Sequence, residues 1–87
     1  MRNQQTENMH MVDYDEDKVD DAVLALLLLT MHDGNRAWKG HDWTVMDRLH
    51  AKGYITDPKG KAKSVAITEE GKAKAERLFL QLFGKVL

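Results

Sequence analysis

The stretch that decides the fold is residues 46–71, MDRLHAKGYITDPKGKAKSVAITEEG, in the second half of the chain. Its apolar residues first recur at helical spacing and then alternate with small or polar ones, as Val65 and Ile67 do. This change of period predicts a helix followed by a β-hairpin. The expected strands are residues 54–57 and 64–68, and the Pro-Lys-Gly-Lys sequence between them supplies the turn.

A helix is predicted on each side of this hairpin. Upstream, Asp42 or Thr44 can cap a helix of about ten residues, which ends at Gly53 as a left-handed cap. Downstream, Thr68 caps a closing helix from Glu69 to about Phe83, with two glutamates in its first turn.

The first element is predicted to be a helix from about Asp15 to His32, with aspartates crowding its start and Gly34 ending it. One apolar stripe at helical spacing comprises Val19, Ala22, Val23, Leu26, Leu27, Thr30 and Met31. The rest of the circumference is filled by Leu24, Ala25, Leu28 and Leu29. A helix that is apolar all round must be buried all round. It is therefore either the central helix or half of a dimer interface.

The 87 residues suffice for one domain, which we place at residues 13–87 after a disordered tail at 1–12. The predicted fold is α+β and mainly α, in the order helix, helix, two-stranded hairpin, helix. The longest apolar run, residues 22–31, is half of the roughly 20 residues that span a bilayer. There is no cysteine and no signal-peptide core, so we expect a cytoplasmic protein without a membrane partner.

Residues 46–71 resemble the second half of a winged helix-turn-helix domain. The sequence Lys52-Gly53-Tyr54-Ile55 is similar to the end of a recognition helix that enters a wing, and the following lysines match a basic wing tip. Ile67-Thr68-Glu69-Glu70-Gly71 resembles the strand-to-helix junction of bacterial regulators of the MarR and PadR type. The resemblance implies a DNA-binding regulator whose closing helix dimerises.

The chain departs from that pattern before the recognition helix. Nine residues separate His32 from Asp42, which leaves room for a turn and not for the further helix of a full winged helix. The whole chain also resembles a small bacterial family of unknown function, which implies no activity.

The net charge of −1 hides an asymmetry between the two halves of the chain. Residues 1–35 carry two basic and eight acidic side chains, whereas residues 36–87 carry eleven basic and six acidic ones. The basic half permits an anionic partner such as double-stranded DNA. The candidate nucleic-acid-binding residues are Arg36, Lys39, Thr44, Arg48, Lys59, Lys61 and Lys63. Lysines on an edge hairpin equally serve to prevent sheet-to-sheet aggregation.

Apolar and aromatic residues suggest further binding surfaces. Trp38 and Trp43, two indoles among cations, could stack on bases or hold a partner helix. Trp43 is predicted to plug the gap between the first two helices and the hairpin, whereas Trp38 fits the core and the surface equally well. Residues 24–29 are apolar on every side, and Leu80 lies off the apolar stripe of the closing helix. We therefore expect a homodimer that is joined through the first and last helices. The candidate partner-binding residues are Trp38, Leu78, Leu80, Leu82 and Phe83.

The sequence offers no catalytic or metal-binding pattern. Asp13, Asp15 and Asp17 imitate the start of a calcium loop, but the loop's required glycine and glutamate are missing. Histidines 32, 41 and 50 are spaced too widely for a zinc site. We therefore expect no enzyme, no metal and no cofactor. The first hypothesis is a small DNA-binding regulator, and the alternative is a protein-interaction or structural homodimeric module.

Overall fold

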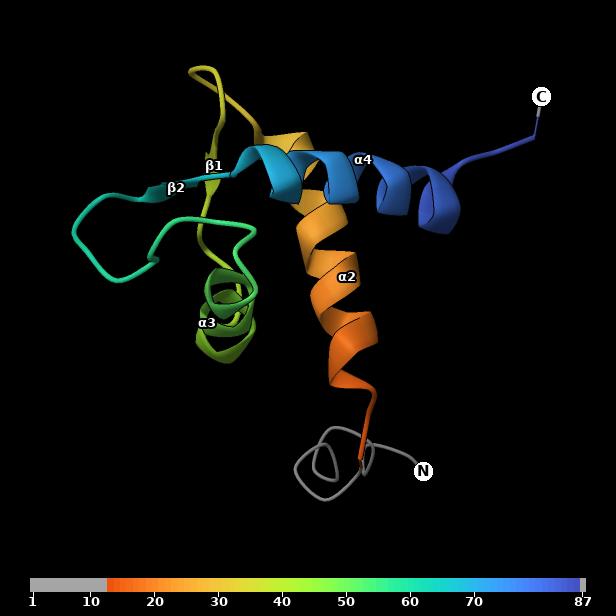
Figure 1. The fold of residues 1–87 in the computed structure, drawn as a ribbon, viewed down its shortest axis with the longest axis horizontal. Coiled ribbons are helices and arrows are strands. Elements are labelled where there is room, and N and C mark those ends of the chain that lie inside the picture. The colour runs from red at the N-terminus through yellow and green to blue at the C-terminus, as the bar shows by residue number, and fades with distance from the viewer. Residues whose placement is uncertain (1–12, 87) are drawn as a thin grey trace, which may run out of the picture.

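A computed structural model describes residues 13–86 of the chain. The fold is α+β and mainly helical, as predicted, and its layout is compatible with a winged-helix-like domain (Figure 1). The elements are α2 (Glu16–Leu27), the 3₁₀ helix η2 (Leu28–Thr30), β1 (Arg36–Trp38), α3 (Trp43–Ala51), β2 (Ser64–Ala66) and α4 (Glu69–Phe83). The predicted tail at residues 1–12 lies outside the described residues.

Helix α2 is the central helix, one of the two roles that its composition allows. It packs against both α3 and α4, and α4 crosses the end of α2 that leads into η2 (Figure 1). The fully buried positions of α2 are Asp20, Leu24, Ala25 and Leu27. The apolar stripe predicted from the sequence lies on a different side of the helix from this buried face, since Leu26, a member of the stripe, is 36 % exposed. On a helix that is apolar all round, periodicity does not select a face, and the positions of α3 and α4 do.

The helix ends follow their capping residues. The Asp42 carboxylate accepts hydrogen bonds from the backbone N–H groups of Thr44 and Val45, which settles the choice between the two predicted caps. The Thr68 hydroxyl accepts a bond from the Gly71 N–H. Gly53 has a φ of +85°, which confirms the predicted left-handed cap.

The sheet differs from the expected hairpin in its pairing. Strand β2 pairs antiparallel with β1, with Ala37 opposite Val65, whereas the sequence predicts only a turn between His32 and Asp42. Residues 54–57 form only an isolated bridge, Ile55 to Ile67, and the Thr56 N–H donates to the carbonyl of Ala66. Hence β2 runs between β1 and residues 54–57. A strand of three residues is too short to show an alternation of apolar and polar side chains in the sequence, so β1 is recognised only by its pairing with β2.

The core lies where α2, α3, α4 and the sheet meet. It includes Leu24, Leu27, Met46, Leu49, Ile55, Val65, Ile67, Ala75 and Leu78. The prediction that Trp43 fills this core is wrong, because its side chain is 63 % exposed. Met46 and Leu49 fill the space from α3 instead. No helix among residues 13–86 has the length and apolar character needed to cross a membrane.

Candidate nucleic-acid interface

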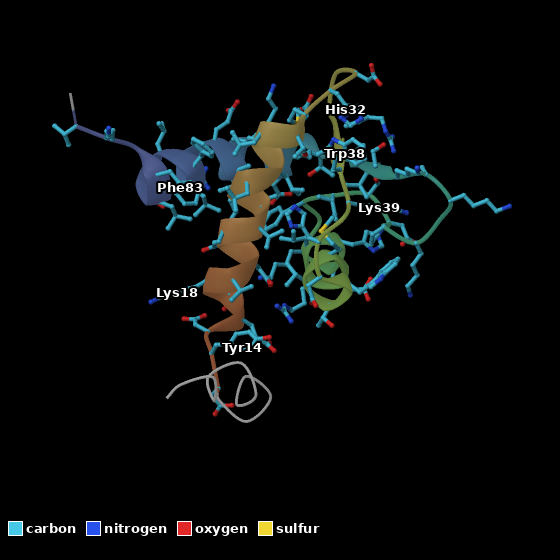
Figure 2. All side chains as sticks on the ribbon, turned by 180° about the vertical axis from the view of Figure 1, so that it is seen from behind. Tyr14, Lys18, His32, Trp38, Lys39 and Phe83 are labelled. Atoms are coloured by element: carbon cyan, nitrogen blue, oxygen red, sulfur yellow. The ribbon has the colours of Figure 1, made fainter. Side chains whose placement is uncertain are left out.

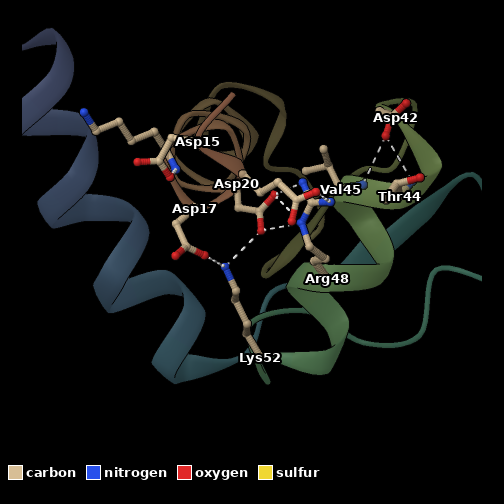
Figure 3. Close-up of polar contacts among 10 residues, drawn as sticks. Asp15, Asp17, Asp20, Asp42, Thr44, Val45, Arg48 and Lys52 are labelled. Carbon is tan, nitrogen blue, oxygen red and sulfur yellow. Dashed lines mark hydrogen bonds and ion pairs between the residues drawn. The ribbon is translucent and has the colours of Figure 1, made fainter. Parts of the chain in front are cut away.

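A buried ion-pair cluster fixes α3 against α2 (Figure 3). The Asp20 side chain is 1 % exposed and accepts bonds from Arg48 at both carboxylate oxygens, at 3.0 and 2.8 Å from Nε and 2.6 Å from Nη2. Lys52 Nζ donates to the same carboxylate at 2.9 Å and to Asp17 at 3.1 Å. Two cations from one helix are therefore bound to one carboxylate of another.

The charges of this cluster stabilise one another. The hydrogen bonds from Arg48 are the main cause that holds the pKa of Asp20 below its ordinary value; burial opposes them, and Lys52 adds to the lowering. The hydrogen bond to Asp20 is also the main cause that raises the pKa of Arg48 and of Lys52, again against desolvation. All three groups stay charged at neutral pH, which a buried carboxylate requires if it is not to destabilise the fold.

Sequence reasoning missed the role of Asp20, because it explained all the early aspartates by the helix dipole. A signal was present: Asp20 lies four and seven residues before Leu24 and Leu27, on the same helical face. A carboxylate on an otherwise apolar face predicts a buried cationic partner.

Arg48, one of the candidate nucleic-acid-binding residues, does not extend from the exposed face of α3. Its guanidinium is directed at α2, and its side chain is 22 % exposed. The exposed positions of α3 are Trp43, Thr44, Asp47, His50 and Ala51 with the end residue Lys52. Asp47 and Lys52 carry opposite charges, so the exposed positions of this helix have no net basic charge.

The loop of residues 57–63, which we call the wing, carries the exposed lysines Lys59, Lys61 and Lys63. It projects beyond the sheet, away from α2 and α4 (Figure 1). Among residues 13–86, no carboxylate oxygen lies within 4.0 Å of any of these three ammonium groups. The charge of the wing is therefore not neutralised by local ion pairs.

Two further predicted cations support the wing and the sheet. Lys39 Nζ donates to the carbonyl oxygens of Pro58 and Gly60, at 2.7 and 2.9 Å, and so ties the wing to the end of β1. Arg36 crosses to β2, where its Nε and Nη2 both lie 2.7 Å from oxygens of Ser64. Lys39 thus lies next to Lys63 in the structure, whereas the side chain of Arg36 lies against β2.

A shallow hollow of about 340 Å³ opens beside the wing. It is lined by Trp38, Lys39, Gly40, His41, Trp43 and Lys63. Trp38 is 52 % exposed, which places it on the surface, and its ring centroid lies 6.0 Å from that of His32 (Figure 2). The hollow thus combines two solvent-accessible indoles with two lysines.

The predicted partner-binding residues of α4 divide between core and surface. Leu78 is 9 % exposed and belongs to the core. Leu80 is 71 % exposed, and Leu82 and Phe83 are about half exposed at the end of α4 that extends past α2 (Figure 1). Within the described part of the chain, no three His, Asp or Glu residues are gathered where they could hold a metal ion.

Comparison with known proteins shows the family of this chain but assigns no function to it. The chain belongs to the family described as Domain of unknown function (DUF6429), whose sequence pattern matches residues 15–85. It is also similar to an uncharacterized protein, y4hR, of Sinorhizobium fredii, with 56 % identity over 72 residues. That match covers 83 % of this chain and 97 % of the relative. No solved structure was found to match the chain.

Proposed function

We propose that this chain is a small cytoplasmic DNA-binding protein that holds the phosphates of duplex DNA with its wing. The observation that carries the proposal is the projecting position of Lys59, Lys61 and Lys63 without carboxylate partners among residues 13–86. Phosphate contacts by lysines supply most of the affinity of non-specific DNA binding. The role is one of binding, with no catalytic step.

The shape of the wing supports this role. The bonds from Lys39 to the Pro58 and Gly60 carbonyls hold the loop, and the Asp57 carboxylate accepts a bond from the Lys59 N–H at 2.9 Å. A loop that is fixed before binding loses less conformational entropy when it contacts DNA. The order α3, wing, β2, α4 also resembles the second half of MarR- and PadR-type domains.

We expect the sequence preference to be weak. Arg48 could bind guanine only by leaving the buried carboxylate of Asp20, which would then retain only Lys52 as a partner. Of the two candidate nucleic-acid-binding residues on α3, Thr44 and Arg48, only Thr44 is exposed, in the first turn of the helix. Asp47 on the same helix repels phosphates. Binding should therefore depend on phosphates more than on bases.

The test is the salt dependence of duplex binding, measured by fluorescence anisotropy with a random-sequence duplex at several salt concentrations. Each lysine–phosphate contact contributes about −0.9 to the slope of log K against log salt. Lys61→Ala should therefore reduce the magnitude of the slope by about one. Lys18→Ala removes the same charge from an exposed site on α2, far from the wing, and should leave the slope unchanged (Figure 2).

Two results would contradict the proposal. One is the absence of binding at roughly 100 μM protein in low salt, which is the weak end of non-specific affinity. The other is an equal loss of slope in both variants. Recovery from the native cell of one stoichiometric protein partner and no nucleic acid would favour the alternative, a protein-interaction module.

We also propose that two copies of the chain pair through the end of α4. The supporting observation is the exposure of Leu80 and Phe83, which lie one turn apart on one face of α4, together with the exposure of Leu82 nearby. Contiguous exposed apolar surface is typical of an interface, and a twofold interface is the commonest arrangement. A dimer would also present two wings to one duplex.

Light scattering at micromolar concentration tests the dimer. The wild type should have twice the 10.0 kDa mass of one chain. Leu80→Glu should shift it to the monomer mass, because an apolar interface does not accommodate a buried unpaired charge. Ala51→Glu, which adds the same charge at the exposed end of α3, should remain dimeric. A monodisperse 10.0 kDa wild type would contradict the proposal.

A further inference from the structure

The hollow beside the wing exposes two indoles whose positions follow from the register of their elements. Trp38 points outward because Ala37, its neighbour in β1, takes the inward position opposite Val65. Trp43 begins α3 and faces outward because Val45 and Met46 face the core. Large aromatic side chains stabilise a small domain mainly when they are buried. Leaving both exposed around one hollow is typical of a binding site.

The charges at this hollow favour an anionic ligand. Its lining includes Lys39, Lys63 and His41 and no carboxylate. The nearest carboxylate in the sequence, that of Asp42, is occupied by the N–H groups of Thr44 and Val45. Lys39 donates two of its three N–H groups to the wing carbonyls, which leaves one for a ligand.

The size of the hollow limits what it can hold. A volume of about 340 Å³ is at the lower end of the range of small-ligand sites, about 300–1,000 Å³. The ligand that meets these conditions is planar, aromatic and negatively charged at one side. A nucleobase with its phosphate has all three properties.

We propose that this hollow binds one unstacked base of a single-stranded nucleic acid, with the adjoining phosphate on Lys63. Every base has a π-face, so stacking on the indoles does not require a particular sequence. A base inside a duplex is paired and stacked on its neighbours, so it does not enter. The inference rests on the proposed function and deepens it, because Lys63 belongs to both the wing and the hollow.

The experiment compares a single-stranded 12-mer of mixed sequence with a blunt duplex of the same length, at one low salt concentration. The wild type should bind the single strand more tightly, and its tryptophan fluorescence should be quenched by it. Stacking contributes about 1–3 kcal/mol per base, so Trp38→Ala and Trp43→Ala should each weaken single-strand binding about tenfold. Both should leave duplex affinity within about twofold.

Three further variants serve as controls. Tyr14→Ala removes another exposed aromatic side chain, at the start of α2 far from the hollow, and should change neither affinity (Figure 2). Trp38→Phe and Trp43→Phe keep an aromatic face, so they should retain most of the single-strand affinity. Each also leaves one tryptophan as the reporter. Circular dichroism of all variants checks that the fold is intact.

The outcomes separate this inference from the proposed function. Duplex binding by the wild type without quenching by the single strand would overturn the inference alone. So would equal weakening of single-strand and duplex binding in the tryptophan variants. Absence of binding to either nucleic acid would overturn both proposals.

Discussion

Arg48→Met is expected to lower the free energy of unfolding by about 3 kcal/mol, because it leaves the buried carboxylate of Asp20 with only Lys52 as a partner. Removing one partner of a buried ion pair costs about 3–5 kcal/mol. We expect the lower end, since the remaining bond from Lys52 at 2.9 Å is retained. Equilibrium unfolding in urea at neutral pH measures the difference.

The matched control is Arg36→Met. Arg36 makes two equally short hydrogen bonds, but its partner is the neutral Ser64 on the partly exposed face of the sheet. Its loss leaves no buried charge behind, so it should cost about 1 kcal/mol. Equal losses in the two variants would show that the Asp20 carboxylate is not the cause.

Acid should reduce the effect of Arg48→Met. The folded-state pKa of Asp20 lies below its ordinary value of 3.8, so its ion pairs stabilise the fold above that pH. This contribution is lost as the pH falls through the lowered folded-state value. The difference in unfolding free energy between wild type and variant should therefore be smaller at about pH 3 than at pH 7. A difference that stays constant would contradict the assignment.

Gly71→Ala is expected to destabilise the protein by about 2–3 kcal/mol, although alanine is the better helix former. A Cβ atom at Gly71 in α4 would overlap the carbonyl group of Tyr54, whose carbon would lie 2.8 Å away. The Tyr54 atoms that would be met, O, C and Cα, all belong to the backbone, so the helix must move to relieve the overlap. Overpacking of this kind costs about 1–3 kcal/mol. The strand-to-helix junction therefore requires glycine at this position.

Gly40→Ala is the control for this prediction. A Cβ atom at Gly40 would meet no other atom within 4 Å, and the residue does not have a positive φ. The substitution should be neutral or stabilise the fold by up to about 1 kcal/mol, because it restricts the unfolded chain. The midpoint temperature of thermal unfolding should be lower than that of the wild type for Gly71→Ala and equal or higher for Gly40→Ala, so the two variants should differ by several degrees. If Gly71→Ala is as stable as the wild type, α4 does not approach Tyr54 so closely.

The two structural results also bear on function. The ion pairs of Asp20 fix α3 on α2, and the contact at Gly71 fixes α4 on the chain just after α3. The wing and the hollow thus lie on a rigid support. A rigid support lowers the entropy lost on binding.

Local chemistry in the sequence determined both ends of α3 and the start of α4, whereas α2 ends at Leu27 and η2 at Thr30, short of the predicted end at His32. Asp42 and Thr68 cap α3 and α4, and Gly53 ends α3 as predicted, because capping involves residues within a few positions of one another. The exposed Leu80 was predicted from helical spacing alone. The three wing lysines were likewise placed correctly in an exposed loop.

Tertiary structure alone decided the features that join distant segments. Strand β1 exists because β2, about thirty residues later, supplies its hydrogen-bond partners. Asp20 is buried because α3 carries Arg48 to it, and Trp43 is exposed because Met46 and Leu49 already fill the core between α2 and the sheet. In each case the free energy depends on a neighbour far away in the chain. Local spacing can show that Asp20 lies on an apolar face, but it does not identify the distant residue that pairs with it. Likewise, only the folded chain brings the two indoles and Lys63 around one hollow.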